Sequence, residues 1–274
     1  MTGTQIDGRV AVVTGAASGI GRALAQNLGA RGCPLALVDR DEAGLEETAN
    51  LVAVPVLKRT MDVSDRWAHQ TLASDVKDWG HGPVGVVINN AGVTLSQTIA
   101  ESSVEDLEWV LNVNFWGVVH GTQAFLPILQ AQDSGAIVNI SSIFGIIAWP
   151  TQGIYCASKS AVKGFTESLR HELHGTGVRA VCVHPGGIRT NIVKNAKVIV
   201  DDHGNTDRKV LEKDFEKVAR TSPAKAATVI LDGVTKGRDR VLIGADARAT
   251  DRLQRIAPVK YFRVIRRLEP LIRR

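Results

Sequence analysis

Short apolar segments alternate with longer amphipathic segments along most of this chain. The short segments consist mainly of Val, Ile, Leu and Ala and predict β-strands at residues 10–14, 35–38, 54–57, 84–89, 136–140, 178–183 and 241–243. Between them, apolar residues recur at the three- and four-residue spacing of a helix, which predicts helices at residues 20–28, 42–51, 66–79, 104–129, 155–173 and 224–233.

This alternation determines the fold class that we expect. Strands joined by helices of these lengths form right-handed βαβ units, and strands that are apolar on both faces lie in a parallel sheet covered by helices on both sides. We therefore predict an α/β protein with a three-layer, doubly wound parallel sheet of about seven strands, a Rossmann fold. The expected catalytic domain spans residues 1–247. Residues 191–220 are polar and interrupt the pattern, and we interpret them as a substrate lid.

Composition narrows the class of protein further. Of the 274 residues, 44% are hydrophobic and 22% are charged, which excludes a long disordered chain. Cys33, Cys156 and Cys182 have no C-x-x-C spacing, and His171 and His174 have no acidic or cysteine partner nearby, so neither a disulfide framework nor a metal site is expected. The first residues lack a secretory signal pattern, and no apolar segment is long enough to cross a membrane. We therefore expect a cytoplasmic protein.

The positive charge is concentrated at the C-terminal end. Residues 248–274 contain nine Lys or Arg residues and two acidic residues, a net charge of +7, so the preceding 247 residues carry −2 of the total of +5. The main part of the chain has no excess of basic residues for nucleic acid, and no nucleic-acid partner is expected.

The same C-terminal segment has a helical apolar stripe. After Pro258, spacings of four, three and four residues place one set of apolar side chains on one helix face, namely Tyr261, Ile265, Leu268 and Ile272. A basic amphipathic tail of this kind either makes a peripheral contact with an anionic membrane or packs on the body or on another subunit. We favour packing, because the stripe is short.

A glycine-rich loop joins the first predicted strand to the first helix. Its sequence over residues 14–21 is TGAASGIG, and it contains Gly15, Ser18, Gly19, Ile20 and Gly21. Backbone N–H groups at a helix N-terminus bind phosphate, and glycine leaves room for the close approach. In this strand–loop–helix context the loop is expected to bind the pyrophosphate of a dinucleotide.

The end of the second strand carries the residues that choose between two dinucleotides. The carboxylate of Asp39 accepts hydrogen bonds from the hydroxyls of an adenosine ribose and repels a 2′-phosphate, which favours NAD. Arg40 follows, and its guanidinium could instead pair with that phosphate. We favour NAD over NADP, because the glycine loop offers no second cation.

Two further motifs follow in order along the chain. The sequence NNAG occupies residues 89–92 after the fourth strand, and YCASK occupies residues 155–159. Together with the glycine loop, these motifs resemble those of the short-chain dehydrogenase/reductase family over residues 7–244. The resemblance implies an NAD(P)-dependent oxidoreductase that acts on CH–OH groups. It also implies a homo-oligomer, for which we expect a tetramer, with a dimer as the second choice.

The resemblance further implies which residues form the site. The catalytic residues would be Asn114, Ser142, Tyr155 and Lys159, with Asn114 holding a water that connects Lys159 to solvent. Beyond the glycine loop, Asp39 and Arg40, the implied cofactor-binding residues are Asp62, Val63, Asn90, Ala91, Gly92, Tyr155, Lys159, Pro185, Gly186, Ile188 and Thr190.

The chemistry of this catalytic set also follows from the residue types. Tyr155 and Lys159 are four residues apart, so they share one face of a helix. A free tyrosine has a pKa near ~10, and a neighbouring ammonium favours its phenolate. Tyr155 would then accept the hydroxyl proton in oxidation and donate it in reduction, while Ser142 hydrogen-bonds the substrate oxygen.

The residues that follow Ser142 indicate the class of substrate. Residues 143–150 read IFGIIAWP and carry no charge, and Val93, Leu95 and Ile188 add apolar surface. Such a site favours a lipophilic alcohol or ketone. Our main hypothesis is therefore hydride transfer between NAD and a lipophilic secondary alcohol or ketone. The alternatives are an NADP-dependent ketone or 3-oxoacyl reductase that uses Arg40, and a non-catalytic nucleotide-binding redox sensor.

Overall fold

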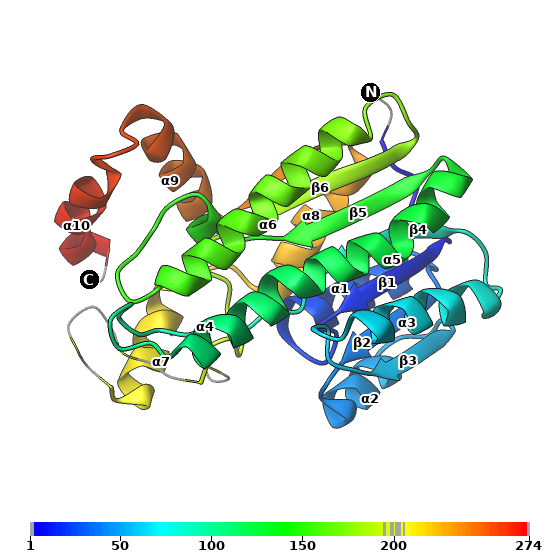
Figure 1. Cartoon of the computed structure of the whole chain (residues 1–274), viewed down its shortest axis with the longest axis horizontal. Helices are drawn as coiled ribbons and strands as arrows, with labels where there is room; N and C mark the ends of the chain where they lie inside the picture. Colours follow the sequence, from blue (N-terminus) through cyan, green and yellow to red (C-terminus); the bar gives the residue numbers. More distant parts are fainter. Residues whose placement is uncertain (1–2, 194–195, 198–199, 201–203, 205, 273–274) are drawn as a thin grey trace.

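Parallel strands form one seven-stranded sheet in the part of the chain that the computed structural model describes, residues 3–193, 196–197, 200, 204 and 206–272. Their order is β3-β2-β1-β4-β5-β6-β7 (Figure 1). The strands are β1 Val10–Thr14, β2 Leu35–Asp39, β3 Val56–Thr60, β4 Val84–Asn89, β5 Gly135–Ile140, β6 Val178–Pro185 and β7 Arg240–Ile243. The order reverses between β1 and β4, as in a doubly wound sheet, which confirms the predicted fold class.

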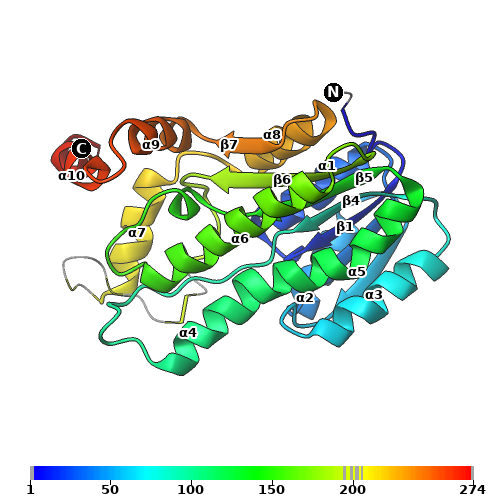
Figure 2. The same ribbon diagram turned by 45° about the horizontal axis from the view of Figure 1, so that its top comes forward.

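Helices cover both faces of the sheet and form the outer layers (Figure 2). On one face lie α1 Gly19–Ala30, α2 Glu42–Asn50 and α8 Pro223–Thr235, and on the other lie α3 Arg66–Asp78, α5 Gly117–Gln132 and α6 Gly153–Glu172. The helix α4 Val104–Leu111 continues the line of α5 beyond the sheet (Figure 1).

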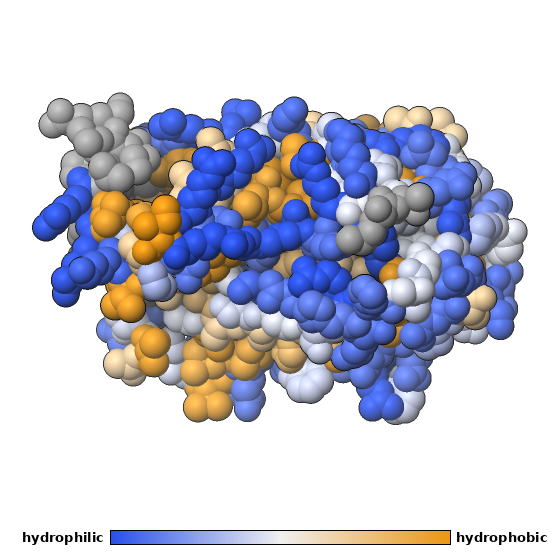
Figure 3. Space-filling view, turned by 90° about the horizontal axis from the view of Figure 1, so that it is seen from above, coloured by the Kyte–Doolittle hydropathy of each residue, from blue (hydrophilic) through white to orange (hydrophobic). Residues whose placement is uncertain are grey.

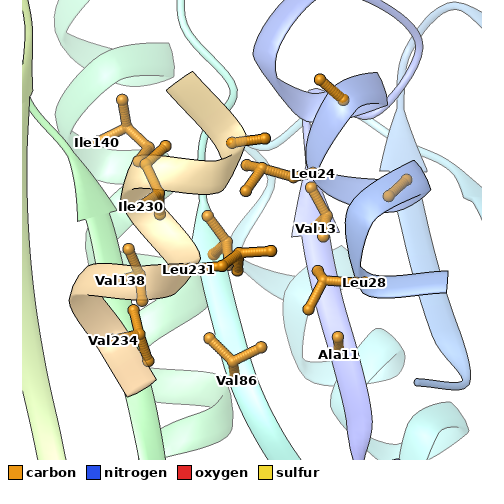
Figure 4. Close-up of a cluster of buried hydrophobic side chains, with 14 of the residues drawn as sticks. Ala11, Val13, Leu24, Leu28, Val86, Val138, Ile140, Ile230, Leu231 and Val234 are labelled. Carbon is orange, nitrogen blue, oxygen red and sulfur yellow. The ribbon is translucent and has the colours of Figure 1, made fainter. Parts of the chain in front are cut away.

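The two-residue period of the strands divides the core between these faces. Ala11 and Val13 of β1 pack under α1 and α8, where Leu24 and Ile230 are fully buried (Figure 4). Val10 and Val12 of β1 point to the other face, against Leu72, Phe125 and Leu169. Because each inner strand is buried on both faces, it has the continuous apolar sequence that identified it.

The third strand differs from its prediction at 54–57. It runs over Val56–Thr60 and includes the polar Lys58 and Arg59. β3 is an edge strand whose position is set by pairing with β2, from Leu35 opposite Val56 to Asp39 opposite Thr60. Hydropathy could not locate it because an edge strand need not be apolar.

The helix predicted at 104–129 is interrupted. A π-helical turn, Asn112–Trp116, separates α4 from α5. Within that turn the side chain of Asn114 pairs with both backbone polar groups of Val93, over 2.8 and 2.9 Å. π-helical turns of this kind occur frequently at functional sites. Side-chain periodicity does not reveal the interruption, because the partner segment is distant in sequence.

Three more helices stand at the carboxyl end of the sheet. α7 Arg208–Val218 belongs to the predicted lid 191–220, of which residues 194–195, 198–199, 201–203 and 205 lie outside the described residues. α9 Ala245–Ile256 and α10 Tyr261–Ile272 follow β7, and the boundary predicted after residue 247 falls within α9. Seen from above, apolar side chains stand among long charged ones at the end that carries α9 and α10 (Figure 3). Within the described residues, no helix is long and apolar enough to span a membrane.

Candidate active site

A cavity of about 660 Å³ lies at the carboxyl ends of the strands, beside the point where the strand order reverses. Ligands of doubly wound sheets bind in this crevice. Every residue predicted for the site lines the cavity except Gly21 and Asn114, which lie behind its wall. The structure thus brings together side chains that are separated by up to 175 positions in the sequence, from Gly15 to Thr190.

The glycine loop forms the wall at the start of α1. Gly15 has φ +67° and Gly19 has φ +54°, conformations that other residues rarely adopt. A Cβ at Gly21 would lie 1.9 Å from the carbonyl oxygen of Gly15, so this glycine lets α1 approach the loop. Ser18 precedes α1 without a side-chain hydrogen bond to the helix. The first N–H groups of α1 therefore have no side-chain cap, which suits a phosphate.

The acidic residues of the cavity are held by backbone N–H groups. The carboxylate of Asp39, at the end of β2, accepts hydrogen bonds from the N–H groups of Ala17, over 2.9 Å, and Asp41, over 3.1 Å. The carboxylate of Asp62 accepts bonds of 2.8 Å from the N–H and the hydroxyl of Ser64. Arg40 also lines the cavity, beside Asp39.

The residues after β4 are tied to the glycine loop. The amide of Asn90 donates to the carbonyl oxygens of Thr14, over 2.9 Å, and Gly15, over 3.2 Å. The Thr14 hydroxyl in turn accepts bonds of 3.0 Å from the N–H groups of Asn90 and Ala91. These bonds fix the NNAG segment against the loop expected to bind the pyrophosphate.

Tyr155 and Ser142 meet at the other end of the cavity. Ser142 follows β5, Tyr155 stands in the first turn of α6, and both line the cavity. Burial raises the pKa of Tyr155 to about 12, and the nearby Ser142 hydroxyl opposes that rise. Phe144 meets the ring of Tyr155 edge-on, at 6.1 Å between centroids. The phenol is therefore protonated at neutral pH in the protein alone.

Lys159 lies one turn along α6, on the same helix face. Its Nζ is 5.8 Å from the centroid of the Tyr155 ring and donates a 3.0 Å bond to the carbonyl oxygen of Ile140. Burial lowers the pKa of Lys159 to about 8, so it still carries a positive charge at pH 7. That charge favours the phenolate of Tyr155.

Asn114 supports the site from behind rather than lining it. Besides its two bonds to Val93, its amide donates to the Ser158 hydroxyl over 3.1 Å, and the residue is fully buried. A Cβ at Gly92 would lie 3.2 Å from the Asn114 oxygen and 3.3 Å from the Lys159 Nζ. The absence of a side chain at position 92 leaves a gap between these two groups. The water that Asn114 is expected to hold, connecting Lys159 to solvent, stays a prediction.

Sequence reasoning missed one residue beneath the catalytic set. The ring of His184, in β6, lies 3.1 Å from the carbonyl oxygen of Ser142 through its Nδ1. Burial lowers the pKa of His184 to about 4, so the ring is neutral at pH 7. A carbonyl oxygen only accepts, so Nδ1 carries the proton and donates it to that bond. No local pattern signals this contact, since the two residues are 42 positions apart.

The far end of the cavity is mainly apolar. Of the predicted residues, Ile143, Phe144, Ile147, Trp149, Val93 and Ile188 line it, whereas Leu95 is buried in the core and residues 145, 146, 148 and 150 do not line it. Sequence reasoning missed several further lining residues, contributed by α7, α9 and α10: Leu211, Phe215, Val218, Asp246, Thr250 and Ile265.

The chemistry of these groups fits a nicotinamide dinucleotide. Gly15 and Gly19 line the cavity without side chains, next to an uncapped helix start, which suits a pyrophosphate. Asp39 offers a carboxylate for the ribose at the end of β2. Among the described residues, no group of three or more His, Cys, Asp and Glu side chains could hold a metal ion.

Comparison with known proteins defines the class to which this arrangement belongs. The sequence pattern of the short chain dehydrogenases matches residues 9–198. The protein SadH of Mycobacterium tuberculosis is 43% identical over 268 residues, covering 96% of this chain and 95% of SadH. The chain therefore belongs to the short-chain dehydrogenase/reductase family. It is an oxidoreductase of that family, which acts on CH–OH groups with NAD(P).

Solved structures agree with this assignment but carry either cofactor. A short-chain dehydrogenase/reductase from Burkholderia phymatum, in complex with NAD, has a TM-score of 0.82 and 31% identity, covering 91% of this chain and 94% of its own. A short-chain dehydrogenase from Burkholderia cenocepacia, in complex with NADP, has a TM-score of 0.76 and 28% identity, covering 93% and 95%. The fold therefore binds NAD(P), and the choice between the two depends on this chain's own residues.

Proposed function

We propose that this enzyme uses NAD to interconvert a lipophilic secondary alcohol and its ketone. The observation that carries the proposal is one cavity that joins Asp39, the Ser142–Tyr155–Lys159 set and an uncharged wall formed by Ile143, Phe144, Ile147 and Trp149. Asp39 favours a ribose with a free 2′-hydroxyl over one with a 2′-phosphate. Ser142, Tyr155 and Lys159 position the alcohol and transfer its proton, and the uncharged wall contacts the apolar part of the substrate.

The roles of the cofactor-binding residues follow from their positions. The N–H groups around Gly19 would hold the pyrophosphate, Asp39 the adenosine ribose, and Lys159 the nicotinamide ribose. The adenine would be bordered by Asp62 and Val63, and the part of the cofactor between the two riboses by residues 90–92. The segment from Pro185 to Thr190 would cover the nicotinamide. A bound nicotinamide would supply the hydride acceptor for the alcohol carbon in oxidation and the hydride donor in reduction.

The protein residues move the proton. In oxidation the phenolate oxygen of Tyr155 takes the hydroxyl proton, while Ser142 holds the substrate oxygen beside it. Burial raises the pKa of Tyr155, so forming the phenolate needs a nearby positive charge, which the ammonium of Lys159 supplies. In reduction the protonated phenol delivers the same proton to the oxygen of the ketone.

A panel of secondary alcohols tests the proposal. The purified protein is mixed with NAD and with 2-alkanols, alicyclic alcohols, sugar alcohols and 2-hydroxy acids, and the absorbance of NADH is followed. We expect the highest kcat/KM for the uncharged lipophilic alcohols, because no charged side chain stands in the wall after Ser142. Preferred turnover of sugar alcohols or 2-hydroxy acids would refute the substrate class. The panel is repeated with NADP, and with the matching ketones and NADH or NADPH; no turnover in any of these assays would favour a redox sensor.

A second candidate is an NADP-dependent ketone or 3-oxoacyl reductase. The observation in its favour is Arg40, whose side chain borders the cavity beside Asp39. If Arg40 bound a 2′-phosphate, Arg40→Ala would weaken NADP binding and leave NAD binding unchanged. Titration of both cofactors against the parent and this variant separates the two candidates.

A further inference from the structure

The helices that follow the last strand hold the far end of the candidate site. We call α9 and α10, residues 245–272, the C-terminal arm. We propose that this arm is the outer wall of the substrate cavity, and that Ile265 of α10 limits the size of the apolar group that the substrate carries. This inference deepens the proposed function and rests on it.

The first helix of the arm is fixed to the sheet and to the loop after β6. The Asp246 carboxylate accepts a 2.7 Å bond from the N–H of Gly187. Asp251 is buried and accepts bonds from the Arg240 guanidinium over 2.7 and 3.2 Å, and from Arg255 over 3.1 Å. Since Gly187 lies within the segment from Pro185 to Thr190 that is expected to cover the nicotinamide, the arm starts within the site itself.

The second helix docks on the loop that follows Ser142. The hydroxyl oxygen of Tyr261 accepts a 2.9 Å bond from the N–H of Ala148. The rings of Phe262 and Trp149 meet edge to face, with centroids 5.5 Å apart. The Arg266 guanidinium lies 5.5 Å from the Phe262 centroid and 5.9 Å from the Trp149 centroid. The Tyr261 hydroxyl also donates a longer bond of 3.5 Å to the Ala148 carbonyl oxygen, so two hydrogen bonds, one aromatic pair and one cation–π cluster attach α10 to residues 148–149.

This docking directs one apolar side chain of α10 into the cavity. Ile265 comes one helical turn after Tyr261, on the same face, and it lines the cavity together with Ile147 and Trp149. Phe215 and Val218 of α7 line the same end. Val264, the neighbour of Ile265, is exposed and does not line the cavity. Ile265 therefore lies on the cavity face of α10, and Val264 lies on its outer face.

The chemistry of this end identifies the part of the substrate that reaches it. A group in contact with Ile147, Trp149 and Ile265 meets hydrocarbon on each side, so an alkyl chain or ring is favoured there over a charged group. One methylene more or less in such a pocket changes kcat/KM by ~10–200-fold. The volume of residue 265 should therefore set which chain length is preferred.

Two opposite substitutions test the wall. Ile265→Ala enlarges this end and Ile265→Phe fills it. In a series from 2-butanol to 2-dodecanol, we expect Ile265→Ala to move the optimum of kcat/KM to longer chains and to lower it for short ones about 10-fold. We expect Ile265→Phe to move the optimum to shorter chains. Opposite shifts cannot arise from partial unfolding, and Val264→Ala, on the outer surface of the same helix, should shift nothing.

A binding measurement keeps this inference separate from the proposed reaction. Calorimetric titration with the matching 2-alkanones should show the same opposite shifts in Kd among the variants, while the Kd for the cofactor is unchanged. If the variants show these opposite shifts in Kd but the parent turns over no alcohol, the proposed reaction is wrong and the proposed wall stands. The proposed wall is wrong if the parent, Ile265→Ala and Ile265→Phe show the same dependence on chain length. It is also wrong if Val264→Ala shifts this dependence as much as the substitutions of Ile265 do. Absence of ketone binding would overturn both.

A third variant tests the docking contact. Tyr261→Phe removes the hydroxyl oxygen that accepts the bond from Ala148 and keeps the ring. We expect a several-fold rise in KM for long-chain alcohols with little change in kcat, because the wall is held less firmly and the catalytic residues are untouched. An unchanged KM across the series would show that this bond does not hold the wall.

Discussion

The carboxylate of Asp39 accepts a hydrogen bond from the backbone N–H of Ala17 over 2.9 Å. Asp39 ends β2 and Ala17 lies in the glycine loop after β1, so this bond ties the residue expected to bind the ribose to the loop expected to bind the pyrophosphate. The negative charge of Asp39 is thereby held in place, and it would meet a 2′-phosphate directly.

Removing this charge should change the cofactor preference. We expect the parent to bind NAD more tightly than NADP. In Asp39→Ala the Kd for NADP should approach or fall below the Kd for NAD, because the repulsion of the 2′-phosphate is lost. Fluorescence or calorimetric titration with both oxidised cofactors measures the ratio of the two Kd values. Glu42→Ala, an exposed acidic residue at the start of α2, is the matched control and should leave it unchanged. Tighter binding of NADP by the parent would refute the preference for NAD.

Loss of the Tyr155 hydroxyl should stop proton transfer while leaving the fold intact. General acid–base catalysis contributes about 10²–10⁴-fold, so Tyr155→Phe should lower kcat by at least this factor. Cofactor Kd and melting temperature should stay close to those of the parent, since the ring still packs edge-on against Phe144. Steady-state kinetics and cofactor titration on the same preparation check both parts. Retained turnover would mean that another residue carries the proton.

The buried ammonium of Lys159 should lower the stability of the protein without cofactor. Burial lowers the Lys159 pKa from 10.5 to about 8, so between these values the unfolded chain holds more protons and stability rises with pH. Below about pH 8 the full penalty is present, on the order of 3 kcal/mol. Lys159→Met should therefore melt at a higher temperature than the parent at pH 7, while its turnover is lost.

The pH dependence of this difference is the decisive measurement. Thermal unfolding followed by circular dichroism at pH 7, 8.5 and 10 should show the advantage of Lys159→Met shrinking as the pH rises. Lys163→Met, one turn further along α6, keeps Lys159 and is the control. An advantage that is independent of pH, or a variant less stable than the parent at pH 7, would contradict this account.

The expected homo-oligomer follows from the resemblance to the family, and two exposed aromatic side chains indicate a candidate contact surface. Trp67 in α3 and Trp116 at the end of the π-helical turn before α5 expose 65% and 47% of their surface, and exposed apolar patches often mark contacts with other proteins. We expect light scattering at micromolar concentration to give the mass of four chains of 29.4 kDa, with two chains as the second choice. Trp116→Glu should lower that mass if the contact includes this face. A monomeric mass for the parent would contradict the assembly.

The tail should not act as a membrane anchor, because two residues of its apolar stripe already contact the rest of the protein. Tyr261 and Ile265 face the loop and the cavity, whereas Ile256 and Val259 are 84% and 88% exposed. We expect the protein to stay in the supernatant when vesicles of phosphatidylserine and phosphatidylcholine are sedimented. Deletion of residues 257–274 should instead lower the melting temperature. Binding to vesicles that salt reverses and the deletion abolishes would restore the membrane interpretation.

The sequence by itself determined the strand–helix alternation and the chemistry of the motifs. Inner strands such as β1 and β4 are buried on both faces, so their apolar composition located them to the residue. The glycine loop was equally visible, because a positive φ at Gly15 and a close approach at Gly21 restrict the residue type locally. Signals of this kind need no knowledge of distant neighbours.

Tertiary structure decided what depends on contacts between distant segments. Pairing with β2 placed the edge strand β3, and the bonds of Asn114 to Val93 accompany the π-helical turn between α4 and α5. The bond between Ala148 and Tyr261 spans 113 positions and makes the C-terminal arm part of the cavity. Hydrophobic periodicity reports which face of a helix is buried but not what buries it, so the stripe containing Ile265 was visible in the sequence and its place in the cavity was not.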